Sequence, residues 1–266
     1  MIARFLRRLL HGRPKRVEIP DELWSWALEQ HPICSRLSDE RVAQLRTRTG
    51  ELRARLYIDA VPGVPNAEEL RLSVALQAAL PVLELGVEWY RAVRTILLVP
   101  GEYEREQEAI DEAGVVHEGR DIVSGEFGQQ APVVLSVDDI EASGWGDGYN
   151  VVIHEMAHVL DGTNGELDGM PALPPRLSPA SWREAMTDAY NDHLRRSRRA
   201  ERAEAGGRTP TQPPIVDPYG AEGREEFFAC ALELIFERPA ALRRGYPRLY
   251  EQLCAFLGFD PAGTDV

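Results

Sequence analysis

The chain has 266 residues, of which 44% are hydrophobic and 27% are charged, and its formal net charge is −13. This composition is ordinary for a globular protein and argues against disordered, collagen-like and coiled-coil classes. No apolar run approaches the ~18–20 residues of a transmembrane helix, so we expect no membrane-spanning segment. The acidic balance argues against direct nucleic-acid binding.

The basic residues are concentrated at the start of the chain. Residues 1–16 carry six basic side chains and no acidic one, and arginines interrupt any apolar segment long enough for a signal peptide. We therefore expect residues 1–20 to form a basic tail. The three cysteines, Cys34, Cys230 and Cys254, form no CxxC pair and do not indicate a disulfide framework. We expect a reducing, cytoplasmic compartment.

The first half of the chain has helical spacing. Apolar residues recur at helical intervals over residues 21–30 and 39–57. The stretch 59–66 is rich in Pro and Gly and predicts a break. Asn66 is then expected to cap a buried helix that ends near Leu80.

The middle of the chain predicts strands. Short apolar or β-branched runs lie at residues 95–99, 115–119 and 132–137. Residues 143–148 form a glycine-rich turn, and the pattern becomes helical again after Tyr149.

The last third predicts helices at 179–199, 222–237 and 246–257, with a long mobile loop at about 195–214. The order of helices, a few strands and further helices predicts an α+β fold, mostly helical, with a small mixed or antiparallel sheet. We expect residues 21–266 to form one domain.

The clearest chemical signal is the sequence His154-Glu155-Met156-Ala157-His158. On a helix, residues four apart differ by about 40° in direction and about 6 Å in height, so both imidazoles can reach one metal ion. Glu155 flanks that ion without facing it, which suits a general base acting on water. This pattern of two ligands and a base is typical of zinc metallopeptidases.

A catalytic zinc ion usually has three protein ligands. None of the other histidines stands at a spacing from this motif that would make it the third ligand. A carboxylate from a later segment is therefore expected. The spacing leaves six candidates open: Glu166, Asp168, Glu222, Glu225, Glu226 and Glu233.

Beyond this motif, much of the chain resembles the Mlc titration factor A family. These are bacterial zinc metallopeptidases of the gluzincin type, related in their catalytic core to the anthrax lethal factor. The resemblance extends from about residue 20 onward, and the segments that carry it are 79–103, 115–127, 132–140, 150–162 and 217–239.

The resemblance implies a zincin-like fold, with the sheet beside the HExxH helix, and one Zn²⁺ per chain. Its metal ligands would be His154, His158 and Glu226. Its catalytic residues would be Glu155 as general base and Tyr219, which lies seven residues before Glu226.

The expected function is hydrolysis of peptide bonds in a peptide or protein substrate, with aminopeptidase-like action on short peptides as one form. The alternative is a regulatory protein that sequesters a transcriptional repressor, with peptidase activity secondary. The resemblance implies this second role because the family binds such a regulator in enteric bacteria.

Overall fold

The computed structural model describes residues 16–64, 67–101 and 132–263. In these ranges the chain is mostly helical with one small sheet. The elements, in chain order, are α2 (Asp21–Gln30), η1 (Pro32–Arg36), α3 (Asp39–Arg55), β1 (Tyr57–Ala60), α4 (Glu68–Ala79), η2 (Val87–Tyr90), β2 (Thr95–Val99), β3 (Val133–Ser136), α5 (Val137–Ala142), α6 (Val151–Asp161), η3 (Gly162–Asn164), α7 (Pro179–Ala205), η4 (Pro218–Ala221), α8 (Arg224–Glu237), α9 (Pro239–Gly245) and α10 (Pro247–Leu257).

The sheet has three strands in the order β1-β2-β3, and both pairings are parallel. The expectation of a mixed or antiparallel sheet was therefore wrong. Strands β1 and β2 are joined by a connection that contains α4, and such helical crossovers return the chain in the same direction. Buried Ile96, Leu98 and Leu135 attach the sheet to the core.

Two of the three predicted strands are confirmed, and the third falls outside the described residues. Residues 95–99 form β2, and β3 falls within 132–137. The stretch 115–119 lies outside the described residues. Strand β1 was not predicted, because four residues directly after a helix are too few to show a period of two.

Several helix boundaries differ from expectation. The N-cap residue of α4 is Ala67, which makes no side-chain capping bond; Asn66, the expected cap, lies outside the described residues. The helix predicted at 246–257 corresponds to α10, and a separate short helix, α9, precedes it. Proline stands at the start of both, where its fixed φ suits a first helical turn.

Helix α7 is longer than expected. It continues to Ala205, so residues 200–205, which were expected to be loop, are helix. Its arginines and alanines are good helix formers, and Asp192 pairs with both Arg195 and Arg196 at the i+3 and i+4 positions. The irregular connection begins only at Gly206 and leads to η4.

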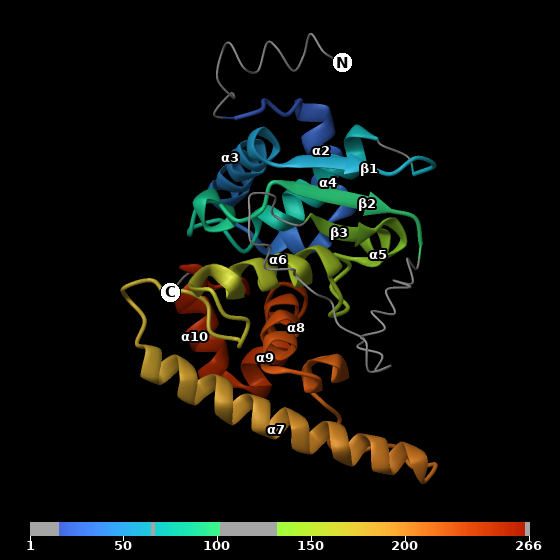
Figure 1. The fold of residues 1–266 in the computed structure, drawn as a ribbon, viewed down its shortest axis with the longest axis vertical. Helices are drawn as coiled ribbons and strands as arrows, with labels where there is room; N and C mark the ends of the chain where they lie inside the picture. Colours follow the sequence, from blue (N-terminus) through green and yellow to red (C-terminus); the bar gives the residue numbers. More distant parts are fainter. Residues whose placement is uncertain (1–15, 65–66, 102–131, 264–266) are drawn as a thin grey trace, which may run out of the picture.

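Helix α6 lies at the centre of the molecule, between the sheet and α8, and α7 runs along the far side of α8 (Figure 1). Helix α6 is buried on almost every side, and among its residues only Glu155 and Val159 are partly exposed. Its first turn is closed by Asn150, whose side-chain oxygen accepts a hydrogen bond from the Ile153 N–H at 3.0 Å. The buried apolar side chains form one cluster that includes residues from Ile19 to Phe259.

Part of the predicted basic tail is attached to this body. Residues 1–15 lie outside the described residues, whereas 16–20 form a segment without regular secondary structure, in which Ile19 is buried. The Val17 N–H donates to the Gly50 carbonyl at 2.9 Å. Among the described helices, none combines the length and apolar character needed to cross a membrane.

His31 is a buried histidine far from the HExxH motif in sequence. Its side chain is 3% exposed, and its Nε2 lies 2.8 Å from the Ser73 hydroxyl. Gly144 adopts φ +90°, and a Cβ there would lie 2.8 Å from the His31 ring nitrogen Nδ1. Burial lowers the pKa of His31 to about 4.

This shift predicts a loss of stability in acid. The pKa of His31 is lower in the folded protein than the value of about 6.5 expected in the unfolded chain. The stability that neutral His31 contributes to the fold is therefore complete above pH 6.5 and is lost as the pH falls toward 4. Linkage gives a loss of about 2 kcal/mol in the free energy of unfolding between pH 7 and pH 5. His31→Gln retains a polar group for Ser73 but does not titrate. In denaturant titrations at pH 7 and pH 5, this variant should lack the loss of about 2 kcal/mol in the free energy of unfolding. An equal pH dependence in both proteins would contradict it.

Candidate metal centre

Two histidines and one glutamate converge where α6 packs against α8. The Nε2 atoms of His154 and His158 are 3.2 Å apart. The Oε2 atom of Glu226 lies 3.0 Å from the first of these nitrogens and 3.4 Å from the second. These are the three residues that the resemblance implied as ligands, and the fold brings all of them together.

The separations suit a small tetrahedral cation. Zinc bound at about 2.0–2.1 Å holds its ligand atoms roughly 3.3 Å from one another, which matches the three distances. The side chains of His154, His158 and Glu226 are only 7%, 6% and 12% exposed. Two imidazoles and a carboxylate form a donor set that zinc accepts in catalytic sites. The residues present therefore fit the implied ion.

Electrostatics at this cluster keep the carboxylate ionised. Burial raises the pKa of Glu226, but the hydrogen bonds and charges of His154 and His158 outweigh that effect and lower it overall. Burial also lowers the pKa of His154, and contacts with Cys230, Glu226 and Glu233 more than reverse this. In the metal-free protein these shifts favour a protonated His154 beside an anionic Glu226, and a metal cation would take the place of the proton at Nε2.

The other five carboxylates that were candidates for the third ligand do not contact the two Nε2 atoms. Glu166, Asp168 and Glu222 are exposed, and Glu225 is half-buried. Glu233 is buried but contacts Nδ1 of His154, the ring nitrogen on the far side from Glu226. Among the six candidates, Glu226 is the one that contacts both Nε2 atoms.

Cys230 lies one turn after Glu226 on α8. With His154 and Glu233 it forms a second group whose potential ligand atoms all lie within 4.8 Å of one another. Burial raises the pKa of the Cys230 thiol to about 11, so it stays protonated at neutral pH. Cys34, Cys230 and Cys254 are all free thiols.

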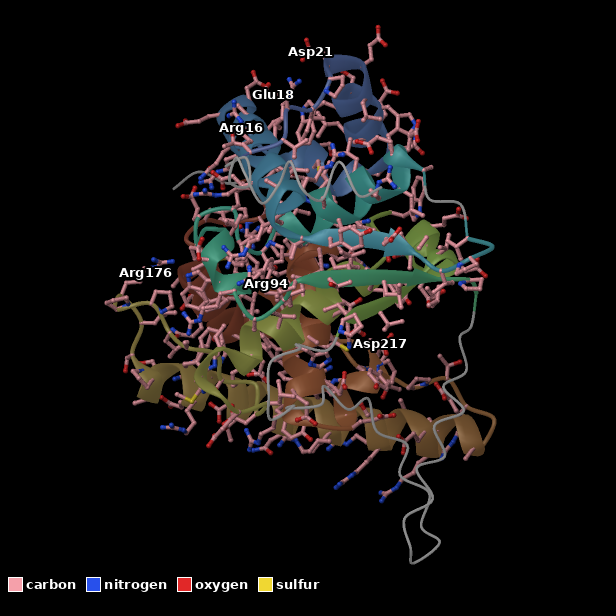
Figure 2. All side chains as sticks on the ribbon, turned by 45° about the horizontal axis from the view of Figure 1, so that its top comes forward. Arg16, Glu18, Asp21, Arg94, Arg176 and Asp217 are labelled. Atoms are coloured by element: carbon pink, nitrogen blue, oxygen red, sulfur yellow. The ribbon has the colours of Figure 1, made fainter. Side chains whose placement is uncertain are left out.

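The two residues expected to act on substrate lie close to the cluster. Glu155 follows His154 on α6 and is half-buried. Tyr219 is in the short turn η4, and its ring centroid lies 5.9 Å from that of His154. Asp217, labelled in Figure 2, fixes the start of this turn by accepting a hydrogen bond from the Tyr219 N–H at 2.9 Å.

Asp161 is the last residue of α6 and follows His158 by three positions. It is fully buried, and its Oδ2 accepts a hydrogen bond from the Gly169 N–H at 2.9 Å. The Gly169 carbonyl in turn accepts from the Trp182 indole at 3.1 Å. Asp161 therefore anchors the segment that follows η3.

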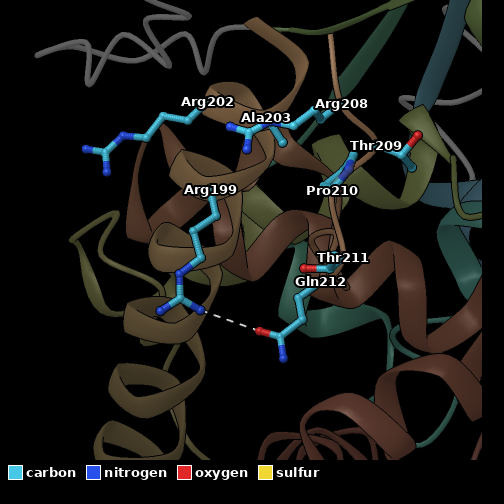
Figure 3. Close-up of a pocket in the computed structure, with 8 residues that line it drawn as sticks. All are labelled: Arg199, Arg202, Ala203, Arg208, Thr209, Pro210, Thr211 and Gln212. Atoms are coloured by element: carbon cyan, nitrogen blue, oxygen red, sulfur yellow. Dashed lines mark hydrogen bonds between the residues drawn. The ribbon is translucent and has the colours of Figure 1, made fainter. Parts of the chain in front are cut away.

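A separate cavity of about 530 Å³ lies near the C-terminal end of α7 (Figure 3). Arg199, Arg202 and Arg208 line it, together with small and polar residues of the following loop. The described residues that line it include no histidine, cysteine or carboxylate, so this cavity is distinct from the cluster of His154, His158 and Glu226.

Comparison with known proteins agrees with this geometry. Proteins called Mlc titration factor A, from Escherichia coli O139:H28 and Klebsiella pneumoniae strain 342, are each 31% identical to the chain over 239 residues. Each alignment covers 90% of this chain and 86% of the relative. A family model described as glucose-regulated metallo-peptidase M90 matches residues 6–257. The chain therefore belongs to the M90 family of glucose-regulated metallopeptidases.

Proposed function

We propose that the chain is a zinc-dependent peptidase in which His154, His158 and Glu226 hold one Zn²⁺. The observation that carries the proposal is the mutual distance of 3.0–3.4 Å among three potential ligand atoms, from two buried histidines of α6 and one partly buried glutamate of α8. Membership of a metallopeptidase family supports the same reaction class. Residues 21–266 would act as one unit.

The bound ion would supply Lewis-acid chemistry, polarising a peptide carbonyl and making a water molecule more acidic. Glu155 would accept a proton from the attacking water and pass it to the leaving amine nitrogen as the C–N bond breaks. Its place beside His154 on α6, partly exposed, supports this role.

Tyr219 would stabilise the negative charge that develops on the carbonyl oxygen. A phenol with a pKa near 10 is a hydrogen-bond donor at neutral pH. The short turn η4 packs against α8, so Tyr219 and Glu226 approach the cluster from adjoining elements. We propose short peptides as substrates, with aminopeptidase-like action, and the cytoplasm as the compartment, which the free thiols favour.

A second candidate function comes from the relatives. Their name, Mlc titration factor A, favours a protein that sequesters the regulator Mlc. For this chain we propose binding of a transcriptional repressor as the alternative, with hydrolysis secondary. The presence of His154, His158 and Glu226 in one cluster favours the peptidase.

Metal analysis tests the ligand set. We expect about one zinc per chain, loss of peptide hydrolysis in a strong chelator and recovery when zinc is restored. Glu226→Gln should weaken zinc binding by more than the ~10–100-fold that loss of a supporting contact costs. Glu222→Gln, on an exposed neighbouring side chain, is the matched control. Full hydrolysis by a zinc-free protein would refute the proposal.

Glu155→Gln tests the base. The amide preserves the shape but cannot accept a proton, so kcat should fall by about 10²–10⁴-fold while zinc content stays at the parental value. Glu166→Gln, in the exposed segment after α6, serves as control. A parental kcat would exclude Glu155 as the base, and loss of zinc would identify it as a ligand.

The same variant separates the two candidate functions. If sequestration is the function, Glu155→Gln should retain full affinity for a purified Mlc-type repressor and full effect on its target promoter. If hydrolysis is the function, the cellular effect should disappear together with kcat.

Tyr219→Phe tests the phenol. It keeps the ring beside His154 and removes only the donor, so kcat should fall by about 10–10³-fold with little change in KM. The control is Tyr190→Phe, whose ring packs on Phe227. Steady-state kinetics at saturating zinc measure this effect. An unchanged kcat in Tyr219→Phe would mean that Tyr219 serves only in packing.

A further inference from the structure

A second carboxylate of α8 contacts His154 from the opposite side. Glu226 and Glu233 are seven residues apart, which places them on one face of a helix about 10 Å apart along its axis. The imidazole of His154 lies between them, with Nε2 3.0 Å from Glu226 and Nδ1 2.8 Å from Glu233. The Glu233 side chain is only 5% exposed, so water does not replace this contact.

The contact at Nδ1 determines what Nε2 can do. Carboxylate oxygens accept hydrogen bonds, so His154 donates its Nδ1–H to Oε1 of Glu233. A cation among His154, His158 and Glu226 would replace the proton at Nε2, and the hydrogen bond to Glu233 keeps the remaining proton at Nδ1. Glu233 therefore selects the tautomer that a ligand at this position needs.

The other oxygen of Glu233 holds the start of α6. Its Oε2 accepts a hydrogen bond from the backbone N–H of Asn150 at 2.6 Å. Asn150 is the N-cap residue of α6, and His154 lies one turn later, with its backbone N–H donating to the Asn150 carbonyl at 2.9 Å. One carboxylate thus attaches to two points of the metal-ligating helix, a backbone group and an imidazole.

Asn150 is itself fixed by two neighbouring elements. Its Nδ2 group donates to Gln77 of α4 at 2.8 Å and to Glu237 of α8 at 3.0 Å. Glu237 also accepts from the Gly146 N–H at 2.6 Å, which ties in the glycine-rich turn. Asn150 and Gln77 are fully buried, and Glu233 and Glu237 nearly so, so each of these bonds is made away from water.

We propose that Glu233 is a positioning residue for the metal centre: it holds His154 in the Nδ1–H tautomer and, through the Asn150 backbone, fixes where α6 begins. This inference rests on the proposed zinc site. The rival role for Glu233 is as a metal ligand with His154 and Cys230. The geometry favours positioning, because both carboxylate oxygens already accept hydrogen bonds from N–H groups at 2.6–2.8 Å.

Glu233→Gln tests the proposal, because an amide has one acceptor oxygen and cannot serve both N–H donors. Competition with a chromophoric chelator should show a zinc Kd about 10–100-fold weaker than that of the parent, still with one ion per chain. Visible spectra of the cobalt-loaded proteins should shift as the His154 ring reorients. The matched control is Glu237→Gln, which loosens the same network one turn away without touching His154 and should leave the zinc Kd within about threefold.

The outcomes separate the rival roles. A parental zinc Kd and cobalt spectrum in Glu233→Gln would overturn the proposal, as would an equal loss of affinity in Glu237→Gln, which would indicate general destabilisation. Two ions in the parent and one in Glu233→Gln would make Glu233 a ligand.

A further measurement separates failure of this inference from failure of the proposed function. In ¹⁵N NMR spectra of the metal-free protein, Nδ1 of His154 should carry a proton, and its chemical shift should move in Glu233→Gln but not in Glu237→Gln. That result would support the inference even if the parent bound no zinc; an unmoved shift would overturn it.

Discussion

The packing of α6 against α8 places a buried imidazole between two buried carboxylates, and much of the described structure serves that arrangement. Helix α8 is buried at every residue from Phe227 to Glu237, yet it carries Glu226, Glu233 and Glu237. Carboxylates in such surroundings need hydrogen-bond donors or cations. His154, His158, Asn150 and the Gly146 N–H provide the donors. The polar groups of α6 and α8 therefore specify how these two apolar helices meet.

The HExxH helix was predictable because its signals are local. The i, i+4 spacing of His154 and His158 places both on one face of any helix, and Asn150 is a residue type that favours an N-cap. Selecting Glu226 from six carboxylates needed the family resemblance, since contacts between residues 72 positions apart leave no periodic signal. Glu233 was among those six, but spacing alone could not show which ring nitrogen it would contact.

The fold was predicted less completely for equally physical reasons. Strand direction depends on the connections between strands, and β1 was too short to be recognised, so the parallel sheet was not foreseen. The end of α7 was expected to be loop because the segment 195–214 finishes in Gly, Thr and Pro, yet the alanines and arginines before them have high intrinsic helix propensity. Local propensity decided that boundary, because few tertiary contacts compete with it there.

The residues of the hydrogen-bond network around Asn150 are far apart in the chain, so this network cannot form until late in synthesis. Gln77, Asn150 and Glu237 come from three helices, and the last of these is made only when most of the chain exists. A nascent chain that ends before α8 has both histidines but lacks Glu226 and the acceptors for Nδ1 and for the cap. The metal site proposed above would therefore be complete only after α8 has been synthesised, which would couple binding of an ion to completion of the core.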